Sequence, residues 1–230
     1  MQQLKLTVLS LRYSSWSIRP WLALTQAGAV FATDIAKLES FDTTTLAERR
    51  KLGSVAGLFP ILRVDGTAIH ESLAICETVA ELFPRAMLWP EPAIDRALAR
   101  ALCCEMVSNF SAIRSEMPCH LFGRAPAFRP SAQAQKNIDR VFEIWTECLE
   151  RSGGPLLFGQ VSLADFFYFP VLTRFRTYGV ALEGEIQAYA ETVEALPAVE
   201  ALFKAARQAP RMALYDDYIV KHGGDPNATD

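Results

Sequence analysis

The spacing of apolar residues changes once along the chain, at a proline-rich stretch that contains Pro84, Pro90 and Pro92. Proline restricts the backbone of the residue before it and interrupts regular structure, so we expect a linker over residues 85–92. Before this stretch, short apolar runs alternate with helical patterns; beyond it, apolar residues recur only at spacings of three and four. The sequence therefore predicts an α/β domain over residues 1–84 and an all-helical domain over residues 93–230.

The first domain has a regular order of predicted elements. Strands are expected at 4–11, 30–38, 60–64 and 67–70, and helices at 17–28, 44–52 and 72–83. The last two strands flank Asp65-Gly66, a dipeptide that tolerates positive φ at both central positions of a two-residue hairpin. The order β-α-β-α-β-β-α suits a four-stranded mixed sheet covered by helices, the thioredoxin plan, although order alone also permits other small α/β folds.

The second domain is predicted to be a helical bundle, with helices at 94–117, 131–151, 162–178, 185–195 and 198–208. The chain ends in a polar segment from His222 to Asp230, which we expect to be frayed. Tyr215 and Tyr218, just before that segment, are the residues that could pack back on the bundle.

Composition and charge exclude several classes of partner. The chain is 50% hydrophobic and 21% charged, as in soluble globular proteins. Its net charge of −3 provides no general attraction to nucleic acid or to anionic membranes. No apolar run reaches the ~20 residues of a membrane span, and the N-terminal residues lack the pattern of a signal peptide. We therefore expect a cytoplasmic protein with no nucleic-acid or membrane partner.

The cysteines and histidines predict neither disulfides nor a metal site. The five cysteines are odd in number and lie mostly within apolar helical patterns, unlike the framework of a secreted protein. The three histidines, at 70, 120 and 222, make no metal-ligand spacing. We expect buried free thiols and no metal.

The chain carries four short segments that follow one another in sequence order: SSWSIR at 14–19, GLFPIL at 57–62, ESLAI at 71–75 and FGQVSLAD at 158–165. They resemble motifs of the cytosolic glutathione S-transferase family. The first is similar to the S-S-x-S-x-R start of zeta-like and related bacterial members, the second places Pro60 where the family has a cis-proline, and the last two resemble E-S-x-A-I and F-G-x-x-S-x-A-D. The resemblance covers nearly the whole chain.

This resemblance implies a homodimeric enzyme that uses glutathione as co-substrate and conjugates it to small apolar electrophiles. Two alternatives stay open: a glutathione-dependent cis-trans isomerase, and a non-catalytic glutathione-binding or scaffold protein of the same fold. Trp16 stands where the isomerase members carry a cysteine. Leu58 stands where a Lys or Gln often reaches glutathione, so contacts to the glycyl carboxylate must come from elsewhere or be weak.

Ser14 is the candidate for activating the thiol. A free thiol with a pKa of ~8.5 is only a few per cent thiolate at neutral pH. A hydroxyl between the first strand and the first helix could donate to the anion, which the helix dipole also favours. The resemblance gives Ser15 a supporting role. Tyr13 is the alternative hydroxyl, and we expect Ser17 to cap the helix.

The resemblance also supplies binding residues for glutathione. A cis bond before Pro60 would let the backbone of Phe59 pair with the cysteinyl unit as an added strand does. Ser72 and the helix start behind it would accept the γ-glutamyl carboxylate, with Glu71 placed for the ammonium group. A plain helix cap explains Ser72 equally well.

Three further features have structural explanations. Asp165, three residues after Ser162, predicts a capping box rather than a catalytic group. Arg114 could face the cleft between the domains, but a solvated surface arginine is the simpler expectation. The aromatic run 166–169 is expected in the core.

Overall fold

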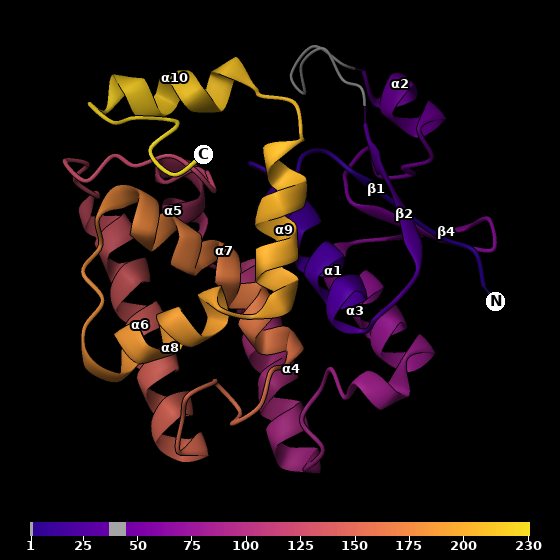
Figure 1. Cartoon of the computed structure of the whole chain (residues 1–230), viewed down its shortest axis with the longest axis horizontal. Coiled ribbons are helices and arrows are strands. Elements are labelled where there is room, and N and C mark those ends of the chain that lie inside the picture. Colours follow the sequence, from indigo (N-terminus) through magenta and orange to yellow (C-terminus); the bar gives the residue numbers. More distant parts are fainter. Residues whose placement is uncertain (1, 37–44) are drawn as a thin grey trace.

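The computed structural model describes residues 2–36 and 45–230, and Figure 1 shows a sheet with its helices beside a larger group of helices. The first half contains β1 (Leu4–Val8), α1 (Ser15–Gln26), β2 (Phe31–Ile35), α2 (Leu46–Lys51), β3 (Ile61–Val64), β4 (Thr67–His70) and α3 (Ser72–Leu82). After a 3-10 turn, η1 (Pro84–Ala86), the second half contains α4 (Ala93–Ser108), α5 (Ser111–Glu116), α6 (Ala132–Ser152), α7 (Leu163–Tyr178), α8 (Gly184–Glu194), α9 (Pro197–Arg207) and α10 (Ala213–Lys221). The linker that we propose thus lies between α3 and α4. The end of the predicted strand 30–38 and the first residue of the predicted helix 44–52 lie outside the described residues.

The sheet has the strand order β2-β1-β3-β4, with β1 and β2 parallel and the other two pairs antiparallel. Leu6 and Val8 of the inner strand β1 are completely buried in the main core. Asp65 and Gly66 have φ of 49° and 88°, the left-handed values that a two-residue hairpin needs. The mixed sheet with its helices, followed by a helical half, confirms the predicted fold class: a thioredoxin-like domain and then a helical domain.

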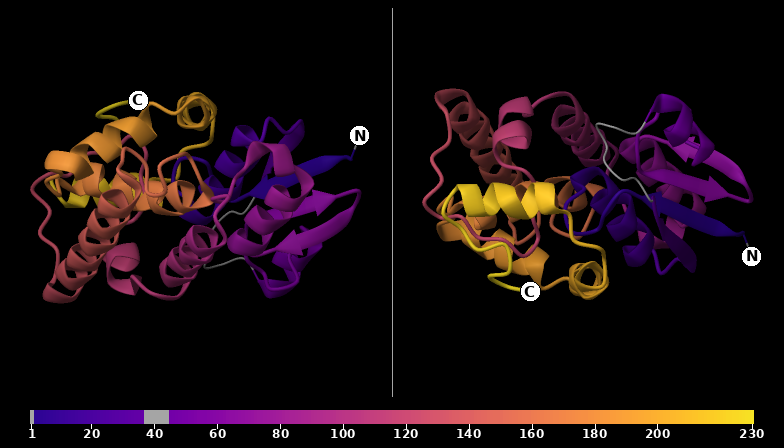
Figure 2. Two further views of the ribbon diagram at one scale, coloured as in Figure 1. Left: turned by 90° about the horizontal axis from the view of Figure 1, so that it is seen from below. Right: turned by 90° about the horizontal axis from the view of Figure 1, so that it is seen from above.

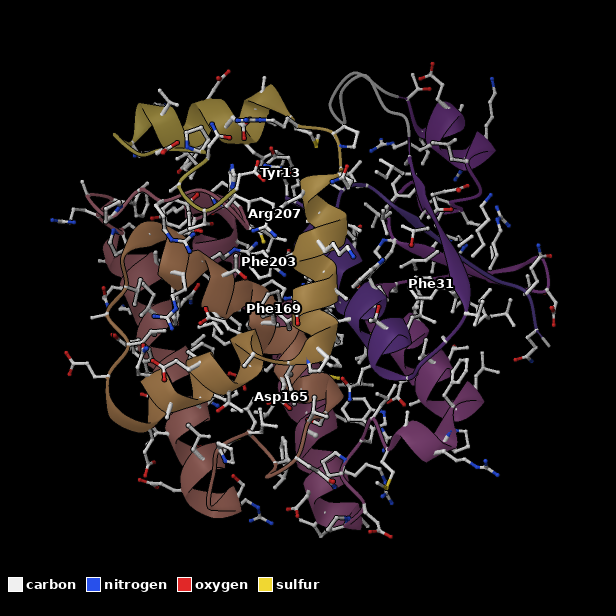
Figure 3. The ribbon with its side chains drawn as sticks, in the orientation of Figure 1. Tyr13, Phe31, Asp165, Phe169, Phe203 and Arg207 are labelled. Atoms are coloured by element: carbon white, nitrogen blue, oxygen red, sulfur yellow. The ribbon has the colours of Figure 1, made fainter. Side chains whose placement is uncertain are left out.

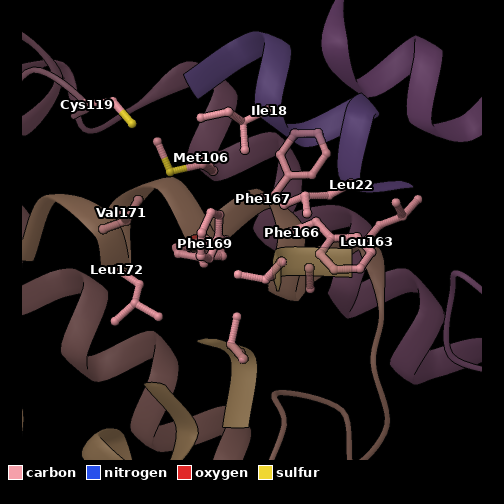
Figure 4. Close-up of a cluster of buried hydrophobic side chains, with 14 of the residues drawn as sticks. Ile18, Leu22, Met106, Cys119, Leu163, Phe166, Phe167, Phe169, Val171 and Leu172 are labelled. Atoms are coloured by element: carbon pink, nitrogen blue, oxygen red, sulfur yellow. The ribbon is translucent and has the colours of Figure 1, made fainter. Parts of the chain in front are cut away.

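Helix α1 joins the two halves. It packs against α3 in the first half and against α7 and α9 in the second, and Figure 2 shows the halves side by side from two further directions. Ile18 and Leu22 of α1 are completely buried in the same core as the residues of α7, as Figure 4 shows. The position of α1 is therefore fixed by both halves.

Helix α7 forms the centre of the second half and is apolar on nearly every side, as a buried helix must be. The four aromatic side chains at 166–169 are at most 1% exposed, which confirms that this run belongs to the core. The start of α7 therefore lies beside α1, where Arg19 donates to the carbonyl of Phe167.

The single helix predicted over 94–117 is wrong, because the chain breaks between α4 and α5. Phe110 lies in the break with a φ of 59°. Its side chain is only 3% exposed, so burial of the aromatic ring offsets the cost of a left-handed backbone. Apolar periodicity continues through the break, which is why the sequence does not reveal it.

The prediction of a frayed C-terminus is also wrong. Asp225 and Arg124 exchange two backbone hydrogen bonds of 2.9 and 2.8 Å, and the carboxylate of Asp230 pairs with the buried side chain of Arg12. Tyr218 on α10 donates to the carbonyl of Glu116 at 2.7 Å. The last helix and the tail are therefore tied to the bundle.

All five cysteines are free, and all but Cys104 are buried, as expected. Burial raises the pKa of Cys148 to about 11 and also raises that of Cys119, so these thiols are unreactive at neutral pH. Among the described residues, no group of three or more His, Cys, Asp or Glu side chains is arranged to hold a metal ion. No helix in the described part of the chain is long and apolar enough to cross a membrane.

Candidate active site

Ser14 lies at the turn from β1 into α1, where it is the N-cap residue. Its backbone is extended, and its carbonyl oxygen accepts from the N–H groups of Ser17 and Ile18 at 3.0 Å each. Its Oγ accepts from Ser17 N–H over a longer distance, 3.4 Å. Our prediction of Ser17 as the cap is therefore wrong: Ser17 lies inside α1, and its Oγ accepts from Leu9 N–H at 3.1 Å.

The hydroxyl proton of Ser14 is available to a ligand. The contacts of Ser14 use its two oxygen atoms as acceptors, and no described residue accepts its hydroxyl proton. The first amides of α1 lack intrahelical acceptors, and the helix dipole places positive partial charge at the same point. A thiolate beside Ser14 would be stabilised by the hydroxyl and by the helix start together.

Ser15, the first residue of α1, is engaged by two arginines. Its Oγ accepts from Arg174 Nη2 at 3.3 Å, and its carbonyl oxygen accepts from Arg19 Nη1 at 3.0 Å. Its side chain is 5% exposed. These contacts connect the start of α1 to Arg174 on α7. The supporting role of Ser15 in catalysis stays a prediction.

Tyr13 is held by the C-terminal helix. Its hydroxyl donates to Asp216 at 2.9 Å, and its ring stacks on Tyr215 with the ring centres 4.8 Å apart. His120 Nε2 lies 3.0 Å from the same carboxylate of Asp216. Figure 3 shows Tyr13 beneath α10. Burial, together with the hydrogen bond to Asp216, raises the pKa of Tyr13, so its hydroxyl is protonated and already committed to α10.

The peptide bond between Phe59 and Pro60 is cis, as predicted. The side chain of Phe59 is 8% exposed and packs with Ala36 and Ile61 in a small second core. Its backbone N–H and C=O form no hydrogen bond with any described residue. Backbone groups beside an apolar cluster require partners. An extended peptide could pair with those Phe59 groups, which have no partner in the described part of the chain.

Glu71 and Ser72 form the start of α3, next to the start of α1. Ser72 Oγ donates to the carbonyl of Trp16 at 3.1 Å and thereby joins the two helix starts. Glu71, not Ser72, caps α3, because its carboxylate accepts from Leu73 N–H at 2.9 Å. The φ of Glu71 is 71°; such a conformation costs a non-glycine residue about 1–3 kcal/mol and is concentrated at functional sites.

Arg114 is not the surface arginine that we expected. It lies on α5, is partly buried, and its guanidinium carbon is 5.3 Å from the centre of the Trp16 ring. Its Nη1 donates to the carbonyl of Val107 at 3.1 Å. Burial, with a smaller contribution from Arg174, lowers the pKa of Arg114. The break before α5 places Arg114 beside the first turn of α1.

Arg19 and Arg174 both contact Ser15, and we assigned neither a role from the sequence, although Arg19 ends the S-S-x-S-x-R segment. Their side chains are almost completely buried, and burial lowers the pKa of Arg19 to about 9, with Arg174 contributing. The sequence could have pointed to both, because each is a charged residue inside a largely apolar helical pattern. Such a pattern indicates a buried charge, and buried charges are concentrated at functional sites.

Asp165 forms the predicted capping box with Ser162 at the start of α7. Its carboxylate accepts from Ser162 N–H at 2.8 Å, from Ser162 Oγ at 3.1 Å and from Leu157 N–H at 3.2 Å. Burial raises the pKa of Asp165 to about 6, so the carboxyl is mostly ionised at neutral pH. All these donors belong to the helix start and the preceding loop, which makes its role structural.

Two family models match the sequence in the order of its two halves. Residues 13–82 match the N-terminal domain of glutathione S-transferase, and residues 92–205 match its C-terminal domain. No match was found among curated protein sequences.

Solved structures of glutathione transferases have similar folds. A homologue from Burkholderia with bound glutathione has a TM-score of 0.68 at 22% identity, over 89% of this chain and 98% of that one. A Sulfitobacter homologue with bound glutathione gives 0.67 at 19%, over 89% and 99%, and a nematode transferase from C. elegans gives 0.69 at 18%, over 92% and 99%. These identities show the shared fold alone. Because both family models match, and together cover both halves, the chain belongs to the glutathione S-transferase family.

Proposed function

We propose that this protein is a glutathione transferase that conjugates glutathione to small apolar electrophiles. The observation that carries the proposal is the Ser14 hydroxyl, a donor at the start of α1 whose proton no described residue accepts. Lowering the pKa of the thiol is the main task of such an enzyme, because free glutathione is a weak nucleophile at neutral pH. The zeta-like character of the serine motif is part of the proposal.

The features around Ser14 suit the other parts of glutathione. The start of α3 would bind the γ-glutamyl carboxylate through the amides that the Glu71 cap leaves free, with the carboxylate of Glu71 on the ammonium group. The backbone of Phe59, which precedes Pro60 and pairs with no described residue, would bind the cysteinyl unit. The bond from Ser72 to Trp16 keeps α3 close to the helix that Ser14 caps. Leu58, which is 60% exposed, offers no charge to the glycyl carboxylate.

Relatives support glutathione as the co-substrate, because the Burkholderia and Sulfitobacter homologues were solved with it bound. In the reaction, the thiol proton passes to solvent and the sulfur becomes a thiolate that accepts a hydrogen bond from Ser14. The sulfur then attacks the electrophilic carbon, a C–S bond forms, and the leaving group departs with its electron pair. Ser15 supports the start of α1 during this step.

The proposal is tested by following thiolate absorbance against pH with glutathione bound. We expect a thiol pKa about one to two units below that of free glutathione, together with consumption of a chloro-dinitroaromatic electrophile at neutral pH. An unchanged thiol pKa without turnover would favour a non-catalytic scaffold. Turnover of a cis-enedione in the absence of conjugation would favour an isomerase.

We propose that the protein is a homodimer, as family membership suggests. Ile94 and Leu98, four residues apart on one face of α4, are 68% and 40% exposed, and Met87 nearby in the chain is 53% exposed. Exposed apolar side chains on one face mark an interface. Light scattering is expected to give twice the 25.5 kDa of one chain, and Leu98→Glu is expected to halve the mass. Leu214→Glu on α10 is the control, and a wild-type monomer at micromolar concentration would contradict the proposal.

We also propose a cytoplasmic location. All five cysteines are free, and the cytosol keeps thiols reduced and supplies the glutathione that the proposed reaction consumes.

A further inference from the structure

Three arginines gather around the first turn of α1, and none of them has a carboxylate partner among the described residues. Arg19 is 0% exposed and Arg174 is 3% exposed, while Arg114 is partly buried. None of the three forms an ion pair with a described residue. By contrast, the equally buried Arg12 pairs with Asp230. Burying a cation without a counter-ion costs free energy, so an anion bound beside this cluster would be stabilised.

The hydrogen-bond partners of the two buried arginines supply no negative charge. Among the described residues, Arg19 and Arg174 donate only to uncharged oxygen atoms: the carbonyls of Ser15, Met117, Phe167 and Pro170 and the hydroxyl of Ser15. Nη2 of Arg19 is buried and has no hydrogen-bond partner among the described residues. The start of α1 adds the positive end of its dipole to the same region.

Arg114 is the member of the cluster that a ligand can reach. Its one hydrogen bond among the described residues uses Nη1, which donates to the Val107 carbonyl. The acidic residue on its own helix, Glu116, is committed to the N–H and hydroxyl of Ser131 at 3.0 and 2.7 Å. The guanidinium carbons of Arg114 and Arg19 lie 5.3 and 4.5 Å from the centre of the Trp16 ring, within the range of a cation–π interaction. Arg114 is thus a positioned, partly exposed cation.

We propose that Arg114 binds a carboxylate carried by the electrophilic substrate, so that the preferred substrates are apolar molecules with one anionic end. The inference rests on the proposed conjugation reaction. Arg114 lies on the helical half, and Trp16, which it contacts, follows Ser14 by only two residues. Ser14 caps the same helix turn that Arg114 contacts through Trp16, so a substrate that extends from the thiolate toward the helical half would place its anionic end near Arg114. A guanidinium suits this role because its planar donors match a carboxylate.

The test compares two aryl chlorides, 1-chloro-2,4-dinitrobenzene and 4-chloro-3,5-dinitrobenzoate, each normalised to its uncatalysed rate with glutathione. Wild type is expected to prefer the benzoate. Arg114→Gln should lower kcat/KM for the benzoate roughly 10- to 100-fold, as loss of a charged hydrogen bond does, and leave the neutral chloride unchanged. Arg114→Lys should retain part of the preference. Arg129→Gln, which removes the same charge from an exposed loop, should change neither rate.

A second measurement separates this inference from the reaction itself. The S-aryl glutathione conjugates of the two chlorides are titrated into wild type and Arg114→Gln by calorimetry. If wild type binds the carboxylated conjugate more tightly and Arg114→Gln loses this difference, the inference is supported. It is supported even if neither chloride is turned over, because the absence of turnover would overturn only the proposed reaction. Equal binding of the two conjugates by wild type would overturn the inference while leaving conjugation standing. If Arg114→Gln lowers kcat/KM equally for both chlorides, or raises the pKa of the bound thiol, then Arg114 binds glutathione and not the carboxylate of the substrate.

Discussion

Replacing Ser14 by alanine is expected to raise the pKa of bound glutathione by about one to two units and to lower turnover roughly ten- to hundredfold. A hydrogen bond to a charged group contributes about 1.5–3 kcal/mol, and each pKa unit corresponds to about 1.36 kcal/mol. In the proposed complex the hydroxyl contacts the sulfur, so the effect should fall on chemistry, whereas affinity should rest mainly on Phe59, Glu71 and Ser72. Thiolate absorbance against pH measures the first quantity, and calorimetric titration of glutathione measures the second.

The same substitution removes the N-cap of α1 and should cost about 1 kcal/mol of stability, so the variant must be compared at a temperature where it is fully folded. Ser14→Thr, which keeps both the hydroxyl and the cap, is expected to recover most of the lost activity. Ser15→Ala and Tyr13→Phe are the matched controls. A shift of the thiol pKa in Ser15→Ala but not in Ser14→Ala would identify Ser15 as the activating residue, and a shift in Tyr13→Phe alone would identify Tyr13.

Local chemistry made several features predictable from the sequence. Asp65-Gly66 predicted the hairpin because few residues tolerate its two positive φ angles. Asp165 predicted a capping box because the two partners lie three residues apart. In both cases the interacting groups are close in sequence, so the residue types alone specify the geometry.

The parts of the site that depend on contacts between distant residues were not predictable. Tyr13 bonds to Asp216 across 203 residues of sequence, and no local pattern marks either side chain as a partner of the other. Arg114 reaches Trp16 because the chain breaks at Phe110, whose buried ring offsets the cost of its left-handed backbone. These features arise from tertiary packing, which outweighs local propensity.

Replacing Asp165 by alanine is expected to lower the free energy of unfolding by about 3 kcal/mol. The carboxylate accepts two backbone N–H groups, from Ser162 and Leu157, and its side chain is completely buried. A buried donor left without an acceptor costs about 1–3 kcal/mol, and water cannot replace the lost carboxylate easily in this packed core. For a chain of this size the melting temperature should fall by roughly 6–12 °C.

Asp95→Ala provides the matched control, because Asp95 also lies in the first turn of a long helix but its carboxylate is 29% exposed and pairs with an exposed Arg151. Its loss should cost less than about 1 kcal/mol. Thermal unfolding measures both variants, and thiolate titration below the transition tests the site. Because the hydrogen bonds of Asp165 to described residues lie within the start of α7 and the loop before it, the thiol pKa of folded Asp165→Ala should equal that of wild type. A variant that stays as stable as wild type but loses thiolate formation would instead place Asp165 in the catalytic machinery.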